Sequence, residues 1–156
     1  MEDKLEQEEY EYAGFWIRVG ASLIDVTLLL MVTLPLTLMI YGSEAVWNSE
    51  EIILGPADFL INYSLPFFAT IIFWMYKSAT PGKMILKLKI LDEKTGNKLT
   101  IGQSIGRYLA YFPAMLVLLL GIFWVAWDKK KQGWHDKLAK TVVVRNKKRT
   151  EDVKFT

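Results

Sequence analysis

The 156-residue chain contains no cysteine and a single histidine, His135. Disulfides, thiolate nucleophiles and cysteine metal sites are therefore excluded, and one imidazole cannot build a histidine-rich metal cluster. The motifs GxSxG, HExxH and GxGxxG, which mark serine hydrolases, zinc proteases and dinucleotide-binding enzymes, are also missing. The sequence thus predicts a protein that is not an enzyme and uses no cofactor or metal.

Lysine and arginine are absent between Arg18 and Lys77, and apolar runs fill that interval. Apolar residues make up 52% of the chain, and its mean hydropathy is +0.19, which exceeds ordinary globular usage. We therefore predict an integral membrane protein whose main partner is the lipid bilayer. The aromatic residues lie within the apolar runs, so no nucleic-acid partner is expected.

Two segments have the length and composition of membrane spans. Residues 15–41 are apolar except for Arg18, Asp25 and a few hydroxyls, and about 20 residues suffice to cross the hydrocarbon core. Residues 42–56 hold three glutamates and no basic residue, so the positive-inside rule places them outside. Residues 57–76 form the second predicted span.

The segment 77–98 holds six lysines, which predicts a cytoplasmic loop. Within it, residues 84–90 alternate apolar and basic side chains in the second half, as expected for a strand with one covered face. Residues 98–100 are predicted to return as a short partner strand after a turn. Residues 141–144 have strand composition and are predicted to join this hairpin as a third strand.

The third apolar segment, residues 101–127, follows Thr100 and Gln103, which have capping-box spacing for a helix start. Its crossing has two interpretations. If it spans fully, the nine basic residues within 129–149 lie outside, against the charge bias. If an interfacial helix turns near Pro113 into a short re-entrant piece, both flanks stay inside, and the charge bias favours this bent form.

The predicted fold is therefore an all-α integral membrane protein. It has two transmembrane helices, a third bent or re-entrant apolar segment, and a small cytoplasmic β-hairpin. Residues 1–12 are predicted to be a mobile acidic tail, 13–146 the membrane domain, and 147–156 a basic cytoplasmic tail. The basic residues are expected to contact anionic lipid headgroups. Three short segments enclose little pathway, so a homo-oligomer is expected.

Arg18 and Asp25 are seven residues apart, so they share one helix face about 10 Å apart along the axis. Counting from Phe15 at about 1.5 Å per residue, Asp25 lies roughly 15 Å deep, near the bilayer middle. Arg18 can reach the cytoplasmic surface, but Asp25 cannot. We expect Asp25 to be protonated, to face water inside the protein, or to pair with Arg107 or Asn62.

Two further features have mainly structural interpretations. Thr80-Pro81-Gly82-Lys83 lacks the spacing of a phosphate-binding loop. It is predicted to be a turn in which Gly82 adopts a positive φ. The lone His135 is predicted to be a surface histidine at the membrane interface.

Taken together, these residues resemble a known family. The residues that carry the resemblance are Arg18 and Asp25, the Thr80–Lys83 run, Arg107, and the run from His135 to Val144. Over roughly residues 14–145 the chain resembles the RDD family, which is named for one arginine and two aspartates. Here these look like Arg18, Asp25 and Asp136. One departure is Lys140, where the family often has glycine, which affects a local turn.

The resemblance implies a small multi-pass protein of a prokaryotic cell (plasma) membrane, thought to transport a ligand. Sodium/proton antiport has been ascribed to some members. On that hypothesis Asp25 exchanges a proton for sodium or another monovalent cation. Arg18 and Asp136 then bias its charge at the cytoplasmic mouth, Asn62 helps to coordinate the cation, and Arg107 is a further candidate. The alternative is a non-transporting membrane scaffold or regulatory subunit.

Overall fold

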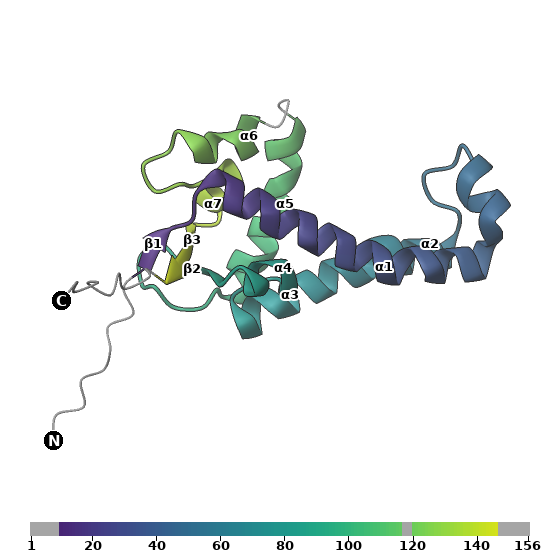
Figure 1. Cartoon of the computed structure of the whole chain (residues 1–156), viewed down its shortest axis with the longest axis horizontal. Coiled ribbons are helices and arrows are strands. Elements are labelled where there is room, and N and C mark those ends of the chain that lie inside the picture. The colour runs from purple at the N-terminus through teal and green to yellow at the C-terminus, as the bar shows by residue number, and fades with distance from the viewer. Residues whose placement is uncertain (1–9, 117–119, 147–156) are drawn as a thin grey trace, which may run out of the picture.

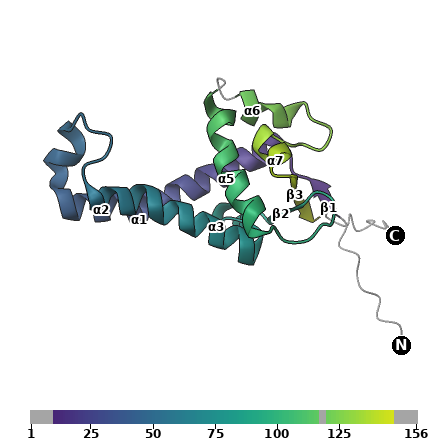
Figure 2. The same ribbon diagram turned by 180° about the vertical axis from the view of Figure 1, so that it is seen from behind.

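The structure is a computed structural model that describes residues 10–116 and 120–146. A compact end holds a small sheet and several short helices, and two long helical segments project from it side by side (Figures 1 and 2). Residues 1–9 of the predicted acidic tail 1–12, and the whole predicted basic tail 147–156, lie outside the described residues.

Helix α1 (Phe15–Asn48) is the first long segment. Only 11% of its most apolar 18-residue stretch is buried, whereas the core helix of a soluble protein would bury most of such a stretch. The predicted span ends at Tyr41, and the helix bends at the next residue because Gly42 has a φ of 78°. The chain then continues as helix to Asn48, within the predicted outer loop.

The second long segment consists of three consecutive pieces: α2 (Pro56–Phe59), the π-helix η1 (Leu60–Ser64) and α3 (Leu65–Lys77). The predicted helix over residues 57–76 is thus confirmed. This segment is part of the range Pro56–Ile85, which passes the length and composition criteria for a membrane span and has 6% of its apolar stretch buried. Trp74, near the end of this segment, is buried in the core.

Helix α4 (Pro81–Ile85) follows after Ser78, which has a left-handed φ of 54°. The predicted turn at Thr80–Lys83 is therefore the first turn of a short helix. Gly82 does not have the positive φ that we predicted. Its lack of a side chain serves a different purpose, because a Cβ there would overlap the carbonyl oxygen of Ala21 in α1.

The compact end contains a three-stranded antiparallel sheet in the order β1-β3-β2. Strand β2 (Leu88–Asp92) pairs with β3 (Thr141–Asn146), with Ile90 opposite Val143. The third strand predicted at residues 141–144 is confirmed, but the hairpin with residues 98–100 is wrong. Leu99 packs into the core and Thr100 caps the next helix, so these residues are not available as a strand.

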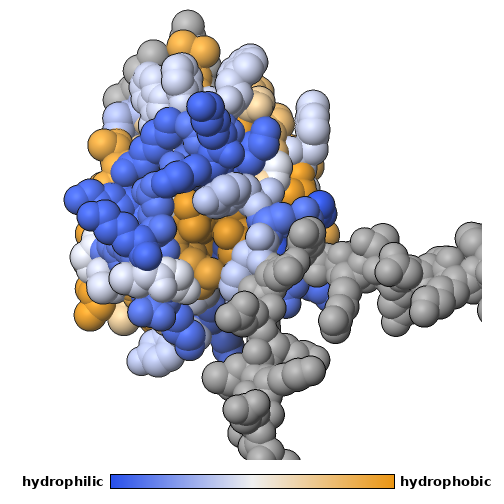
Figure 3. Space-filling view, turned by 90° about the vertical axis from the view of Figure 1, so that its left-hand side faces the viewer, coloured by the Kyte–Doolittle hydropathy of each residue, from blue (hydrophilic) through white to orange (hydrophobic). Residues whose placement is uncertain are grey.

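Strand β1 (Tyr10–Tyr12) pairs with the other edge of β3. These three residues were predicted to belong to the acidic tail. Glu11 is opposite Arg145 in the register and forms an ion pair with it. The segment before α1 and strand β3 therefore lie together at the compact end. Figure 3 shows hydrophilic side chains gathered on that end of the molecule.

Helix α5 (Ile101–Leu116) begins where the capping box predicts. The Thr100 hydroxyl accepts from the Gln103 backbone N–H at 3.2 Å, and the Gln103 side chain accepts from the Thr100 backbone N–H at 3.0 Å. The helix runs through Pro113 without ending, so the bend is not where we predicted it.

The third apolar segment nevertheless folds back on itself. Helix α6 (Leu120–Phe123) and the 3-10 turn η2 (Trp124–Ala126) follow α5. Gly121 lies against Ala114, where a Cβ would come within 2.8 Å of the Ala114 backbone. Helix α6 thus packs back on the end of α5, as expected for the bent form of this segment.

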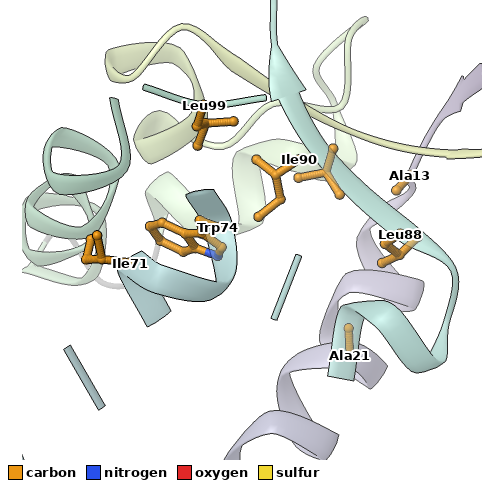
Figure 4. Packing of buried hydrophobic residues seen from close by; sticks show 8 residues of the cluster. Ala13, Ala21, Ile71, Trp74, Leu88, Ile90 and Leu99 are labelled. Carbon is orange, nitrogen blue, oxygen red and sulfur yellow. The ribbon is translucent and has the colours of Figure 1, made fainter. Parts of the chain in front are cut away.

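Helix α7 (Trp134–Leu138) and β3 complete the compact end. Between them, Lys140 has a φ of 54°, a conformation that glycine adopts without steric cost. This explains why glycine suits the position. The core lies between the sheet, α1, α3 and α5, where Ala21, Trp74, Ile90 and Leu99 are buried (Figure 4).

Candidate functional site

Three charged side chains from distant parts of the sequence meet at the compact end. Asp136 in α7 lies between Arg18, in the first turn of α1, and Arg107 in α5. Its Oδ2 atom is 2.6 Å from Nη1 of Arg18, and its Oδ1 atom forms an ion pair with Nη1 of Arg107. We call Arg18, Arg107 and Asp136 the arginine–aspartate cluster.

The start of α7 holds the Asp136 carboxylate in place. The backbone N–H of Gly133 donates to Oδ2 of Asp136 at 2.9 Å, as expected for a carboxylate in the first turn of a helix. A Cβ on Gly133 would come within 2.9 Å of the Gly121 carbonyl oxygen and 2.8 Å of the His135 ring. The packing of α6 on α7 therefore leaves room only for glycine.

Arg18 is held by protein acceptors. Its Nε donates to the Ala13 carbonyl at 3.0 Å, and its Nη2 donates to the Lys131 carbonyl. The prediction that Arg18 extends to the membrane surface is therefore wrong. It can be buried because two backbone carbonyls, one just before α1 and one late in the chain, accept hydrogen bonds from its guanidinium.

Arg107 is more deeply buried, with 1% of its surface exposed. It donates to the Thr141 hydroxyl, and its guanidinium lies 5.3 Å from the centre of the Trp74 ring. Its Nε has no hydrogen-bond partner among the described residues. The predicted pairing of Arg107 with Asp25 is therefore wrong.

The electrostatic balance of the cluster favours an ionised Asp136. Burial raises the pKa of the Asp136 carboxyl, but the neighbouring Arg107 and Arg18 guanidinium groups outweigh burial and hold the pKa below its usual range. Two guanidinium groups then face one carboxylate, so the cluster carries a net positive charge. A buried charge without a counter-charge is unfavourable and attracts an anion.

His135 is buried beside the cluster and is not the surface histidine that we predicted. Its ring stacks on Tyr111 with centroids 4.0 Å apart, and its Nε2 is 3.5 Å from Oδ1 of Asp136. Burial lowers the pKa of His135 to about 3, and the positive charge of Arg107 acts in the same direction against the opposing effect of Asp136. His135 is therefore neutral at pH 7.

This shift predicts a defined acid sensitivity. The pKa of His135 falls from 6.5 in the unfolded chain to about 3 in the folded chain, so below pH 6.5 only the unfolded chain binds this proton. The free energy of unfolding should thus decrease from pH 6.5 toward pH 3, by at most about 1.4 kcal/mol per pH unit. His135→Phe, which keeps an aromatic ring on Tyr111, should unfold with a shallower pH dependence. Equal slopes in denaturation measured from pH 7 to 4 would contradict this assignment.

Asp25 has different partners from those predicted. It is half-buried, and it accepts from the Thr80 hydroxyl at 2.5 Å and from the Gly82 backbone N–H at 2.6 Å. Its two oxygens thereby tie α1 to the first turn of α4. The pairing with Arg107 or Asn62 that we predicted does not occur.

Asn62 belongs to a second polar group at the other end of the long helices. Its side-chain amide donates to Thr37 at 2.9 Å and to the buried Asp58 at 2.6 Å. Thr37 is 12 residues beyond Asp25 on α1, which corresponds to about 18 Å along the axis. Asn62 therefore clamps the helices together and does not share a site with Asp25.

A cavity of about 300 Å³ adjoins the arginine–aspartate cluster. It is lined by residues of α1, α4, α5, α6, α7 and neighbouring segments, and its polar lining consists of Arg18, Ser22, Lys83, Arg107, Tyr111 and His135. Lys83 is 7% exposed, and its ammonium group is 3.4 Å from the Thr80 hydroxyl. The sequence did not identify Lys83 as a site residue, although it is the basic residue of the Thr80–Lys83 run.

A second hollow, of about 460 Å³, lies on the surface near η2. Four of its five charged residues form the ion pairs Lys130–Glu93 and Lys137–Asp128, both at 2.5 Å, and the lysines of these pairs are exposed. Its cations are therefore solvated, whereas those beside the arginine–aspartate cluster are buried. No group of three or more acidic or histidine side chains suited to a metal ion occurs within residues 10–116 and 120–146.

Two exposed apolar helical segments of spanning length, joined to a compact end with a buried arginine–aspartate cluster, define a small membrane protein. The sequence profile of the RDD family matches residues 12–140. The chain therefore belongs to the RDD family, as its resemblance predicts.

Several bacterial proteins are similar to this chain in sequence. The uncharacterized protein YxaI of Bacillus subtilis is 31% identical, over 85% of this chain and 96% of its own length. The uncharacterized membrane protein YteJ of the same organism is 30% identical, over 88% and 84% respectively. The uncharacterized protein RP437 of Rickettsia prowazekii is 29% identical, over 86% and 96%. No solved structure matches the chain.

Proposed function

We propose that this membrane protein binds an anionic solute in the cavity beside the arginine–aspartate cluster, as the binding step of a transporter. The observation that carries the proposal is the charge around the cavity, where Arg18, Lys83 and Arg107 all contribute to the lining. Two carboxylates offset part of this charge. Asp136 forms an ion pair with Arg18, and Asp25 accepts a hydrogen bond from Gly82 in α4. Three cations and two carboxylates leave one net positive charge, which an anion would neutralise.

The same charges argue against sodium as the ligand of this cavity, because three cationic side chains would repel it. Sodium/proton antiport through Asp25 would require that carboxylate to release its protein donors. Both of its oxygens accept hydrogen bonds from α4, which supports a structural role for Asp25. The scaffold alternative predicts no ligand for the cavity and no flux.

We also propose a multi-pass arrangement in the plasma membrane of a prokaryote, with α1 and the α2–α3 segment as the two spans. Pairing of β1 with β3 supports this arrangement, because it requires the chain before α1 and the chain after α7 to be on one side. An even number of crossings follows, in agreement with a third segment that folds back. The basic residues of 77–98 and 129–149 favour the cytoplasm for that side.

The binding proposal is tested on the full chain, purified in a nonionic detergent, with inorganic phosphate as the probe. At matched ionic strength, potassium phosphate should raise the midpoint of thermal unfolding more than potassium chloride does. Lys83→Gln should weaken apparent phosphate affinity by roughly tenfold or more, since one charge-assisted hydrogen bond is lost. Lys77→Gln, which removes the same charge at an exposed position, should leave the affinity unchanged.

Two outcomes would overturn this proposal. One is stabilisation that depends on sodium and not on phosphate, which would favour the antiport hypothesis. The other is a phosphate effect of equal size in wild type and Lys83→Gln, which would place the bound anion elsewhere.

A further inference from the structure

The cavity beside the arginine–aspartate cluster has two chemically different ends. Its inner end holds Arg107 and His135, each at most 4% exposed. Its outer end includes Leu23 and Val26 of α1, whose side chains are largely exposed. A molecule that fills the cavity would therefore present a charged group to the inner end and an apolar group to the outer end.

The outer end lies within a helix that is apolar enough to cross a membrane. Leu23 and Val26 are eight and eleven residues beyond the start of α1 at Phe15, which corresponds to about 12 and 17 Å along the helix. Ile122 of α6 also lines the cavity. At that depth, the exposed apolar mouth meets hydrocarbon and not water.

The inner end has hydrogen-bonding capacity that the protein leaves unused. Nε of Arg107 and Nδ1 of His135 are buried and have no partner among the described residues. Lys83 has a long contact of 3.4 Å to Thr80. Buried polar groups are ordinarily satisfied, so the unpaired Nε–H of Arg107 beside the cavity indicates a ligand that accepts hydrogen bonds.

We infer that the ligand of this cavity is an amphiphile with a single anionic head, such as a carboxylate or phosphate group, and a hydrocarbon chain. This inference rests on the proposed function and specifies the class of anion. The head lies among Arg18, Lys83 and Arg107, and the chain leaves between α1 and α6 toward the bilayer. One negative charge balances the net positive charge of the group. A volume of about 300 Å³ is at the lower end for ligand sites and suits a head with the first part of a chain.

The test compares three probes on the full chain in a nonionic detergent: oleate, oleyl alcohol and inorganic phosphate. Oleate has both the charge and the chain, oleyl alcohol lacks the charge, and phosphate lacks the chain. Oleate should raise the thermal unfolding midpoint at a concentration at least tenfold below that needed for phosphate. Oleyl alcohol should have no effect.

The outcomes separate this inference from the proposed function. If phosphate stabilises as effectively as oleate, the anion site stands and the amphiphile inference is wrong. If oleyl alcohol stabilises as effectively as oleate, the charge is irrelevant and both fail. If no probe stabilises the protein, both also fail.

A matched pair of variants locates the chain-binding end. Val26 and Val32 are both in α1 and both 52% exposed, but only Val26 lines the cavity. Val26→Phe should occupy the mouth and weaken oleate binding by tenfold or more while phosphate binding is kept. Val32→Phe should change neither. Equal oleate affinity in both variants would overturn the inference.

Discussion

Asp136→Asn is expected to lower the free energy of unfolding by about 3–5 kcal/mol, because it leaves two buried guanidinium groups without a counter-charge. Asp136 is fully buried and forms ion pairs with both Arg18 and Arg107. The measurement is reversible unfolding of the purified protein in mixed micelles, followed by circular dichroism.

Asp128→Asn is the matched control. Asp128 forms an ion pair with Lys137 at 2.5 Å near the surface, so its loss should cost about 1 kcal/mol or less. Should Asp136→Asn prove too unstable to purify, Arg18→Gln combined with Asp136→Asn is informative. The double variant should lose less stability than the sum of the two single losses, because it removes a charge together with its partner. Additive losses would contradict a coupled cluster.

Gly82→Ala is the second substitution with a large expected effect. A Cβ at position 82 would overlap the Ala21 carbonyl oxygen and come within 2.9 Å of the Asp25 carboxyl carbon. Helix α4 would have to move away from α1, which would break the hydrogen bond from Gly82 to Asp25. We expect a loss of about 2–4 kcal/mol, from overpacking together with a lost charge-assisted hydrogen bond. Thermal and denaturant unfolding in detergent measure this loss.

Gly102→Ala provides the comparison for that substitution. Gly102 is in α5, and a Cβ there would meet nothing within 4 Å. Because alanine is the better helix former, this variant should be unchanged or more stable by up to about 1 kcal/mol. A similar loss in both variants would mean that the contact between α4 and α1 is not as close as the structure indicates.

Local features of the structure were predictable from the sequence. Hydropathy located both long helical segments, because spans of about 20 apolar residues are encoded contiguously. The capping box at Thr100 and Gln103 located the start of α5, because its donors and acceptors are within three residues of one another. The strand at residues 141–144 followed from its β-branched composition.

Long-range partners were not predictable in this way. Arg18 and Asp136 are 118 residues apart, and nothing in their spacing indicates that they meet. The resemblance to the RDD family singled out both residues but did not indicate that they form a pair. Asp25 was assigned the wrong partners because a helix periodicity describes one face of α1 and not what packs against it. The β1–β3 pairing was missed because three residues carry too little alternation to predict a strand.

Lys83 illustrates a different limit. Its run, Thr80–Lys83, was recognised, but the sequence pattern indicated only a turn. Packing of α4 against α1 instead buries Lys83 beside the cavity. The close approach that Gly82 allows is thus the physical reason why this lysine contributes to the site.

Anomalous scattering from crystals grown with bromide tests the central claim most directly, since bromide reports the position of a bound anion. Our account predicts an anomalous peak in the cavity, within reach of Arg18, Lys83 and Arg107, and its loss in Lys83→Gln crystals. Bromide confined to the outer surface would contradict the account. So would a rubidium ion in the same cavity of crystals grown with rubidium in place of potassium.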